Sequence, residues 1–237
     1  MTASKMRSDL RATAVKVSAS DADVVRAARV STLGGLAGYS VGGMKDAGLI
    51  NFLMRDRHGS PFEHTSFTFL VEAPIFVARE HMRHRAGWSY NEESGRYKEL
   101  EGTFYLPPDD RPLRQVGKAG AYEFLEGTEE QWEAVDEEFR DLYRAAYAGY
   151  QSMLSVGVAR EVARMVLPVG IFTSYYATCN ARSLMHFLGL RTKDKAAKVP
   201  SFPQAEIEEV AKQMEATLSE AMPLTYAAFQ NNGRVAP

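Results

Sequence analysis

One long amphipathic helix is the strongest constraint that this sequence places on its fold. Thr128-Glu129-Glu130-Gln131 is a capping-box pattern, in which the threonine and glutamine side chains accept from each other's backbone N–H groups. Apolar residues then recur at steps of three and four and form one continuous stripe: Trp132, Val135, Phe139, Leu142, Tyr143, Ala146, Tyr150 and Met153. We expect this stripe to face the core or a subunit interface rather than a cofactor.

Shorter elements are predicted on both sides of this helix. Residues 65–71 alternate, with Phe67, Phe69 and Val71 on one side, which predicts a strand. Pro74 stands where a helix begins, and that helix leads toward Arg83. The same reasoning predicts further helices over residues 22–30, 44–57, 158–167, 181–190 and 203–221, and strands over residues 104–106 and 171–179.

Composition narrows the class of protein. A chain of 237 residues with 45% hydrophobic and 24% charged residues suits one folded domain over residues 1–237. No apolar run approaches the roughly 20 residues that a bilayer requires, and the start lacks a signal peptide's apolar stretch, so we expect a cytoplasmic protein without a membrane partner. A net charge of −2 gives no broad basic surface, which argues against nucleic acid as a partner.

The densest chemistry lies in residues 83–97. Arg83, His84 and Arg85 are followed by Ser89, Asn91, Glu92, Glu93, Ser94 and Arg96. Clustered arginines suit phosphate, and the serines and asparagine can orient a polar ring. Either glutamate can accept from a ribose hydroxyl or an imide N–H. The stretch therefore predicts a nucleotide ligand, and the competing interpretation is a solvated helix end.

Other chemistries fit less well. His58, His64, His81 and His84 lie in one region with Glu63 and Glu80, but there is no His-Glu-x-x-His pattern and the neighbouring arginines oppose a cation. We therefore predict no metal site.

Covalent and loop-based sites are also disfavoured. The single cysteine, Cys179, excludes an internal disulfide and is interpreted as a packing residue in a strand rather than a nucleophile. Ser94 lacks a Gly-x-Ser-x-Gly context, so it is interpreted as a positioning hydroxyl. Neither a Gly-x-Gly-x-x-Gly loop nor a P-loop is present, so side chains and loops must bind any dinucleotide.

The order of these residues resembles a known family signature. Arg83-His84-Arg85, a short gap, and then Ser89, Asn91, Glu92, Ser94 and Arg96 resemble the R-H-R and S-x-N-E-x-S-x-R blocks of the flavin-dependent thymidylate synthases. Two further stretches resemble that family: residues 58–64, an H-x-S/T-P-x-E-H block, and residues 180–191.

The sequence departs from the family pattern in three respects. Ala86, Gly87 and Trp88 stand where two residues are usual, and Gly87 favours a bulge or loop start that absorbs the extra residue. Lys195 stands where some relatives have histidine, and His186 where asparagine is common.

The resemblance implies an α/β (α+β) fold, a mixed sheet flanked by long helices, assembled as a homotetramer with FAD between subunits. It also implies synthesis of dTMP from dUMP, with 5,10-methylenetetrahydrofolate as carbon donor and NADPH as reductant through FAD, as part of de novo dTTP biosynthesis. Arg191 is the implied catalytic residue. The competing hypothesis is a non-catalytic nucleotide-binding or RNA-binding module.

Two sets of contacts follow from the resemblance. The implied FAD contacts are His58, Ser60, Glu63, Arg83, His84, Arg85, Glu92, Asn180, Ala181, Arg182 and His186. The implied dUMP contacts are Glu80, His81, Met82, Arg83, Glu92, Glu93, Ser94, Gly95, Arg96, Arg164 and Arg191.

Overall fold

The computed structural model describes residues 4–34, 44–118 and 121–237. In chain order its elements are β1 (Lys5–Arg7), β2 (Arg11–Ser18), α1 (Asp21–Leu33), α2 (Met44–Arg55), the 3-10 turn η1 (Ser60–Glu63), β3 (Ser66–Pro74), α3 (Ile75–His81), β4 (Trp88–Glu92), β5 (Thr103–Tyr105), β6 (Arg114–Lys118), β7 (Ala121–Leu125), α4 (Glu129–Ser155), α5 (Arg160–Ala163), η2 (Arg164–Val166), β8 (Phe172–Cys179), α6 (Ala181–Arg191), α7 (Ala205–Ala221) and α8 (Pro223–Asn231). This is the mixed α/β composition that the resemblance implies.

The chain divides into two compact units, each built from three separate stretches. The first unit comprises residues 1–10, 72–79 and 92–174, and the second comprises residues 11–71, 80–91 and 175–237. The expectation of one domain over residues 1–237 stays a prediction.

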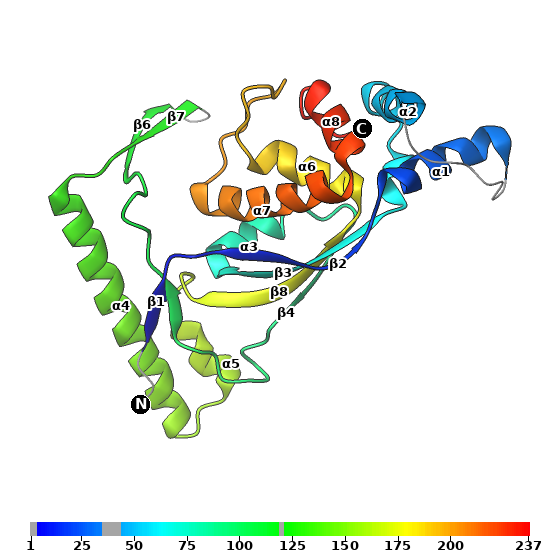
Figure 1. Cartoon of the computed structure of the whole chain (residues 1–237). Helices are drawn as coiled ribbons and strands as arrows, with labels where there is room; N and C mark the ends of the chain where they lie inside the picture. The colour runs from blue at the N-terminus through cyan, green and yellow to red at the C-terminus, as the bar shows by residue number, and fades with distance from the viewer. Residues whose placement is uncertain (1–3, 35–43, 119–120) are drawn as a thin grey trace. The chain divides into compact units, whose positions relative to one another are not determined.

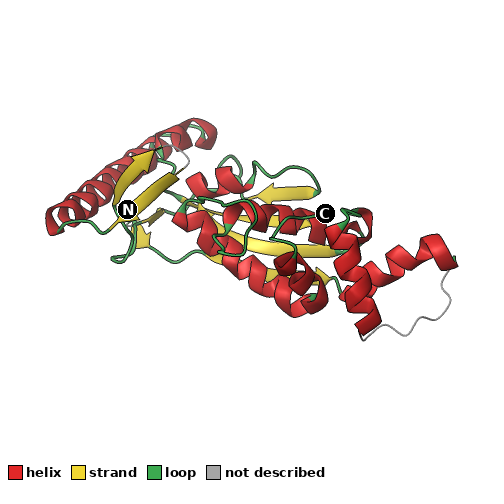
Figure 2. Cartoon of the chain, turned by 90° about the horizontal axis from the view of Figure 1, so that it is seen from above, coloured by secondary structure: helices red, strands yellow, loops and turns green. Residues whose placement is uncertain are grey.

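The second unit contains most of a four-stranded sheet with strand order β2-β3-β8-β4. Phe67, Phe69 and Val71 of β3 are all fully buried, as their alternation predicts. Helix α7 packs on β2, α6 and α8, so helices cover one face of the strands (Figures 1 and 2). Strand β8 leads directly into α6 through the single residue Asn180.

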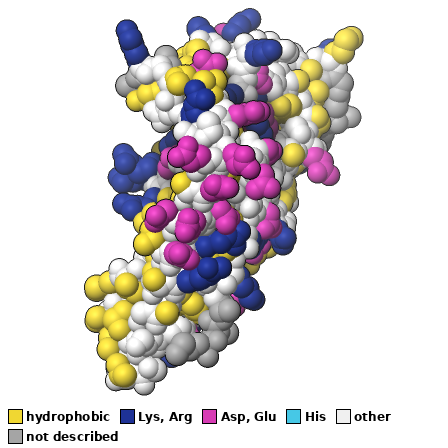
Figure 3. Space-filling view, turned by 90° about the vertical axis from the view of Figure 1, so that its left-hand side faces the viewer, with side chains coloured by type: hydrophobic (Ala, Val, Ile, Leu, Met, Phe, Trp, Pro, Cys, Tyr) yellow, Lys and Arg dark blue, Asp and Glu magenta, His cyan; other side chains and the backbone are white. Residues whose placement is uncertain are grey.

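Helix α4 organises the first unit. The predicted capping box is present: Thr128 Oγ1 accepts from Gln131 N at 3.3 Å, and Gln131 Oε1 accepts from Thr128 N at 3.0 Å. Tyr143 and Tyr150 of the predicted stripe pack around Phe104 in an aromatic core, together with Tyr147, which the predicted stripe did not include. The stripe is not buried throughout, because Leu142 is 62% exposed. Figure 3 shows a band of acidic side chains on the molecular face where α4 lies.

Several elements differ from the expectations. The predicted helix over residues 158–167 is two short turns, α5 and η2, because Pro168 ends it soon after it begins. The connection after Arg85, expected as a loop, becomes strand β4. Strands β1, β2, β6 and β7 and helix α8 were not predicted. Among the described residues, no helix is long and apolar enough to cross a membrane.

Candidate functional site

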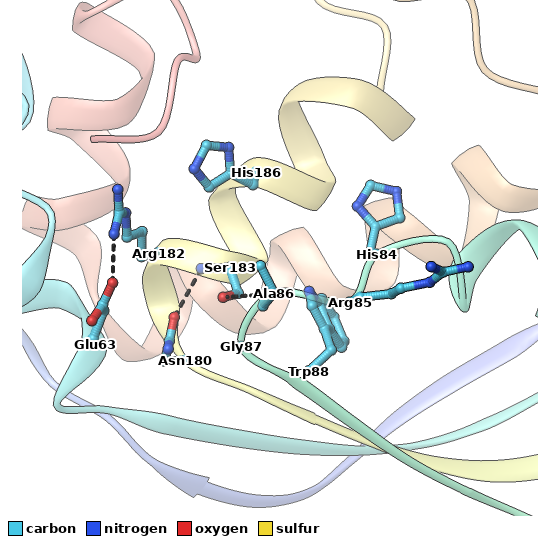
Figure 4. A pocket seen from close by; sticks show the side chains of 10 residues that line it. All are labelled: Glu63, His84, Arg85, Ala86, Gly87, Trp88, Asn180, Arg182, Ser183 and His186. Atoms are coloured by element: carbon cyan, nitrogen blue, oxygen red, sulfur yellow. Dashed lines mark hydrogen bonds and ion pairs between the residues drawn. The ribbon is translucent and has the colours of Figure 1, made fainter.

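A cavity of about 460 Å³ lies at the start of α6 in the second unit (Figure 4). Asn180 caps this helix, since its side-chain oxygen accepts from Ser183 N at 2.9 Å. The cavity is lined by Glu63, His84, Arg85, Ala86, Gly87, Trp88, Asn180, Arg182, Ser183 and His186. Six of these ten belong to the implied FAD set, although they come from three distant stretches of chain.

A tight turn docks the arginine block against α6. Gly87 has a φ of 70°, a conformation that favours glycine, and Ser183 Oγ donates to the Ala86 carbonyl at 2.9 Å. A Cβ atom at Gly87 would collide with Ser183 Oγ. Ala86 and Gly87 thus form a turn, as expected of Gly87, and β4 begins immediately afterwards at Trp88.

The cavity has cationic and neutral donors. Arg85 is exposed at its edge, and Arg182 pairs with Glu63 and also donates to the Pro237 carbonyl at 2.6 Å. Burial, followed by the charges of Arg191 and His186, lowers the pKa of His84 to about 4. Burial and the nearby Arg182 and Arg57 also lower the pKa of His186. At neutral pH the two imidazoles are uncharged, so the guanidinium groups supply the positive charge.

Arg191, the last residue of α6, lies beside this cavity in a charged cluster. Its Nη1 donates to Glu80 Oε2 at 3.0 Å, and its Nε donates to His84 Nε2 at 3.1 Å. The histidine must therefore accept at Nε2, which agrees with its lowered pKa. Three residues of different implied roles, Arg191, Glu80 and His84, are thus joined.

His81 lies beneath this cluster and is fully buried. Trp88, Tyr90, Tyr175 and Phe187 surround its ring, with centroid distances from 4.6 to 5.7 Å. Burial, with smaller contributions from His84 and Arg191, lowers the pKa of His81 to about 3. Its imidazole is a neutral packing group, so its side chain does not reach solvent.

A second cavity, of about 360 Å³, lies in the first unit. Its polar lining comprises Glu92, Glu93, Gly95, Arg164 and Thr173, and the rest is mainly apolar: Ile75, Leu100, Met165, Leu167, Ile171 and Phe172. Four of these lining residues belong to the implied dUMP set. At Gly95 an added Cβ would lie 2.8 Å from Leu100 Cδ1 and 3.3 Å from Arg164 Cδ, so a larger residue there would have to displace these side chains.

Ser94 and Arg96, two further members of the dUMP set, are sequence neighbours of residues that line this cavity. Ser94 Oγ accepts from Arg96 N at 3.2 Å, and Arg96 Nε donates to Glu161 at 3.0 Å. Both members of the Arg96–Glu161 pair are more than half exposed, so the pair is weak and a ligand anion can compete for the guanidinium.

The adjacent glutamates are already hydrogen-bonded to β8. Glu92 Oε1 accepts from Thr173 Oγ1 at 2.7 Å, and Glu93 Oε1 accepts from Ser174 N at 3.0 Å. Lys98 forms an ion pair with the other oxygen of Glu93 at 2.7 Å. These bonds fix the backbone that precedes Ser94.

The remaining implied contacts lie outside the lining of both cavities. His58, Ser60 and Arg83 are exposed, Met82 is half-buried, and Ala181 is buried with its N–H donating to Thr65 Oγ1 at 2.9 Å. Conversely, Trp88 and Ser183 line the first cavity and were not predicted to do so. Trp88 directly follows the Ala86–Gly87 turn, and Ser183 lies three residues after Asn180. These positions in the sequence could have identified both residues.

The structure also bears on the disfavoured chemistries. Among the described residues, no group of three or more His, Cys, Asp or Glu side chains is arranged to hold a metal ion. Cys179 is 3% exposed, and burial raises the pKa of its thiol, as suits the packing role predicted for it.

Comparison of the sequence with known proteins points to one family. Residues 13–224 match the family described as thymidylate synthase complementing protein. A flavin-dependent thymidylate synthase of Streptomyces avermitilis is 63% identical over 98% of this chain and 95% of its own length. One from Thermotoga neapolitana is 43% identical over 91% of this chain and 88% of its own length.

A solved structure has the same fold. The crystal structure of a UMP/dUMP methylase, PolB, from Streptomyces cacaoi bound with 5-Br dUMP aligns with a TM-score of 0.93 and 51% identity. The alignment covers 98% of this chain and 100% of that chain.

Proposed function

The chain belongs to the family of flavin-dependent thymidylate synthases, and from this membership we propose that it makes dTMP from dUMP by reductive methylation. It is an enzyme, and its family depends on a flavin. In the proposed reaction 5,10-methylenetetrahydrofolate donates the carbon, NADPH supplies the electrons through FAD, and the product enters de novo dTTP biosynthesis. The cytoplasm, where NADPH and nucleotides are available, is the proposed location.

The observation that carries this proposal is the cavity at the start of α6. Separate stretches of chain, residues 63, 84–88 and 180–186, contribute to one pocket containing two arginines, two neutral histidines and an aromatic ring. A volume of about 460 Å³ is within the range of roughly 300–1,000 Å³ found for small-molecule sites. Ligands of nucleotide size therefore fit it.

The donors of this cavity fit a flavin dinucleotide. Arg85 and Arg182 can bind its pyrophosphate, and the start of α6 favours negative charge. Gly87 lets the backbone approach α6 where a side chain would collide with Ser183. We propose that the residues of the implied FAD set contact the flavin. The cavity lining supports this role for five of them: His84, Arg85, Asn180, Arg182 and His186. Bound there, the flavin would carry the hydride, chemistry that belongs to the cofactor.

For dUMP we propose the contacts that the resemblance implies, apart from Glu80, with the cavity beside Gly95 in support. Among these residues, Arg96 and Arg164 are proposed to bind the phosphate of dUMP, and Ser94 is proposed to position the nucleotide through its hydroxyl. Both arginines are exposed, so they can reorient to meet a dianion.

Arg191 is the proposed catalytic residue. Uracil becomes a carbon nucleophile when negative charge develops on N3 and the carbonyl oxygens. A fixed guanidinium aimed at that charge lowers the barrier, typically by about 3 kcal/mol in a site that excludes water. Its pairing with Glu80 and His84 supports a single orientation of that group.

We further propose a homotetramer in which sites are shared between subunits. Each cavity described within one unit is small for a flavin, a nucleotide and a folate together. Clefts between copies would supply the missing room, and symmetric assembly is the usual way to form them.

UMP is a second candidate substrate. The observation that favours it is the 50% identity, over 100% of both chains, to a UMP/dUMP methylase bound with 5-Br UMP. Parallel assays with both nucleotides discriminate the two candidates: formation of dTMP supports the proposal, and methylation of UMP alone contradicts it.

A flavin assay and a complementation assay test the proposed function against the binding-module hypothesis. The purified protein should be yellow, heat should release FAD, and the gene should restore growth of a thymidine-requiring bacterium. The acidic band on the face where α4 lies repels polyanions and so disfavours RNA there (Figure 3). A colourless protein that takes up no FAD and binds RNA with a steep salt dependence would favour the module.

A further inference from the structure

Glu80 and His84 contact Arg191 at two different nitrogens. Glu80, near the end of α3, accepts from Nη1 at 3.0 Å, whereas His84, in the following turn, accepts from Nε at 3.1 Å. The two acceptors lie on different edges of the planar guanidinium, so together they fix its plane. Nη2 of Arg191 has no acceptor within the described part of the chain.

We infer that Glu80 is a positioning residue, which holds the Arg191 guanidinium in its working orientation through the Nη1 hydrogen bond. This inference rests on the proposed function, in which Arg191 acts on uracil. It gives Glu80 a different role from the direct dUMP contact that the resemblance implies.

The charge of Glu80 favours this role over direct contact. Negative charge is proposed to develop on the uracil ring, and a carboxylate against that ring would oppose it. Placed behind Arg191, the same carboxylate orients the cation without touching the substrate. The Glu80 and Arg191 side chains are 31% and 23% exposed, so solvent screens their interaction only in part.

His84 provides the second anchor because it is neutral. Burial and the adjacent Arg191 disfavour a charged imidazole, so Nε2 keeps the lone pair that the Arg191 Nε–H requires. The Arg191 guanidinium thus has two acceptors, the charged Glu80 carboxylate and the neutral His84 imidazole. A mutation at Glu80 changes the first acceptor and leaves the second in place.

A double-mutant cycle tests the assignment. Glu80→Ala and Glu80→Gln are made in the normal chain and in Arg191→Ala, and dUMP affinity is measured by calorimetry on the FAD-loaded protein. We expect Glu80→Ala to weaken dUMP binding and lower kcat by about 10- to 100-fold in the normal chain, as misplacement of a catalytic group does. In Arg191→Ala the same change should have less than about a twofold effect. Glu80→Gln should recover most of the loss, because its amide oxygen still accepts from Nη1.

Equal losses in the two backgrounds would overturn the inference, since they would show that Glu80 touches dUMP itself. Asp136→Asn is the matched control, because it removes a surface ion pair with Arg140 of 2.7 Å and should leave dUMP affinity unchanged. Retained FAD content shows that each variant is folded.

Crystal structures of the two Glu80 variants separate this inference from the proposed function. Displacement of the Arg191 side chain in Glu80→Ala but not in Glu80→Gln supports positioning, whatever the substrate is. An unmoved Arg191 side chain in Glu80→Ala overturns it. Failure of the normal protein to bind or methylate dUMP would contradict the proposed function alone.

Discussion

Nδ1 of His81 lies 3.0 Å from the hydroxyl of Tyr175, inside an aromatic cluster that buries the imidazole completely. The cluster includes Trp88 and Phe187, on elements that also carry residues of the first cavity. A neutral histidine in this place makes the second unit sensitive to acid.

The free energy of unfolding should fall as pH falls from about 6.5 toward 3. The unfolded chain takes up a proton at His81 near the usual pKa of about 6.5, whereas the folded chain resists it until about 3. Stability from this group is therefore complete above pH 6.5 and is lost progressively below it. His81→Phe keeps an aromatic ring but cannot titrate, so its stability should depend less on pH. Urea unfolding of both proteins at several pH values measures the two slopes, and equal slopes would contradict the prediction.

Arg191→Ala should nearly abolish dTMP formation while FAD stays bound. Loss of one fixed group that stabilises developing charge typically lowers kcat by about 100- to 1,000-fold. Steady-state kinetics and the flavin absorbance of the purified variant check both parts. Loss of the flavin instead would move Arg191 to the cofactor site.

Ser94→Ala should raise the KM for dUMP by about 2- to 10-fold and leave kcat measurable, because one hydrogen bond typically contributes about 0.5–1.5 kcal/mol. The hydroxyl supports the turn that carries Arg96, through the bond from Arg96 N of 3.2 Å. Initial rates over a range of dUMP concentrations separate KM from kcat. No turnover at saturating dUMP would argue for a chemical role of Ser94.

Gly87→Ala should weaken FAD binding and destabilise the protein. A left-handed conformation costs a non-glycine residue roughly 1–2 kcal/mol, and the new methyl group would also collide with Ser183 in the cavity wall. FAD affinity is measured by fluorescence titration of the apoprotein.

Gly157→Ala is the matched control for that change. Gly157 also has a positive φ, of 84°, but a Cβ atom there meets nothing within 4 Å. This variant should lose only the conformational part of that stability, roughly 1–2 kcal/mol, and retain FAD affinity. If both variants lost FAD equally, the effect would come from general destabilisation and not from the cavity.

Much of the architecture was predictable because local signals agreed with the packing. The capping box at Thr128 and the cap at Asn180 both form as their sequences predict, and the alternation in β3 gives its buried face. These signals operate within a few residues, so no distant partner is needed to interpret them.

The missed elements depend on distant partners. Only the two aromatic residues of positions 88–92, Trp88 and Tyr90, are partly buried, and the segment becomes strand β4 in the sheet beside β8. The helix predicted over residues 203–221 is followed by Pro223, which is the first residue of the unpredicted α8, a position that suits proline. For the site, Ser183 was missed because its contact with Ala86 joins residues 97 positions apart.

The measurement that most directly tests the central claim is product analysis with labelled donor. The FAD-loaded protein is incubated with dUMP, NADPH and 5,10-methylenetetrahydrofolate carrying ¹³C at the methylene carbon, and the nucleotides are analysed by mass spectrometry. We predict dTMP that carries one ¹³C, dependent on NADPH and on Arg191. Unchanged dUMP under these conditions, with FAD bound, would contradict the proposed function.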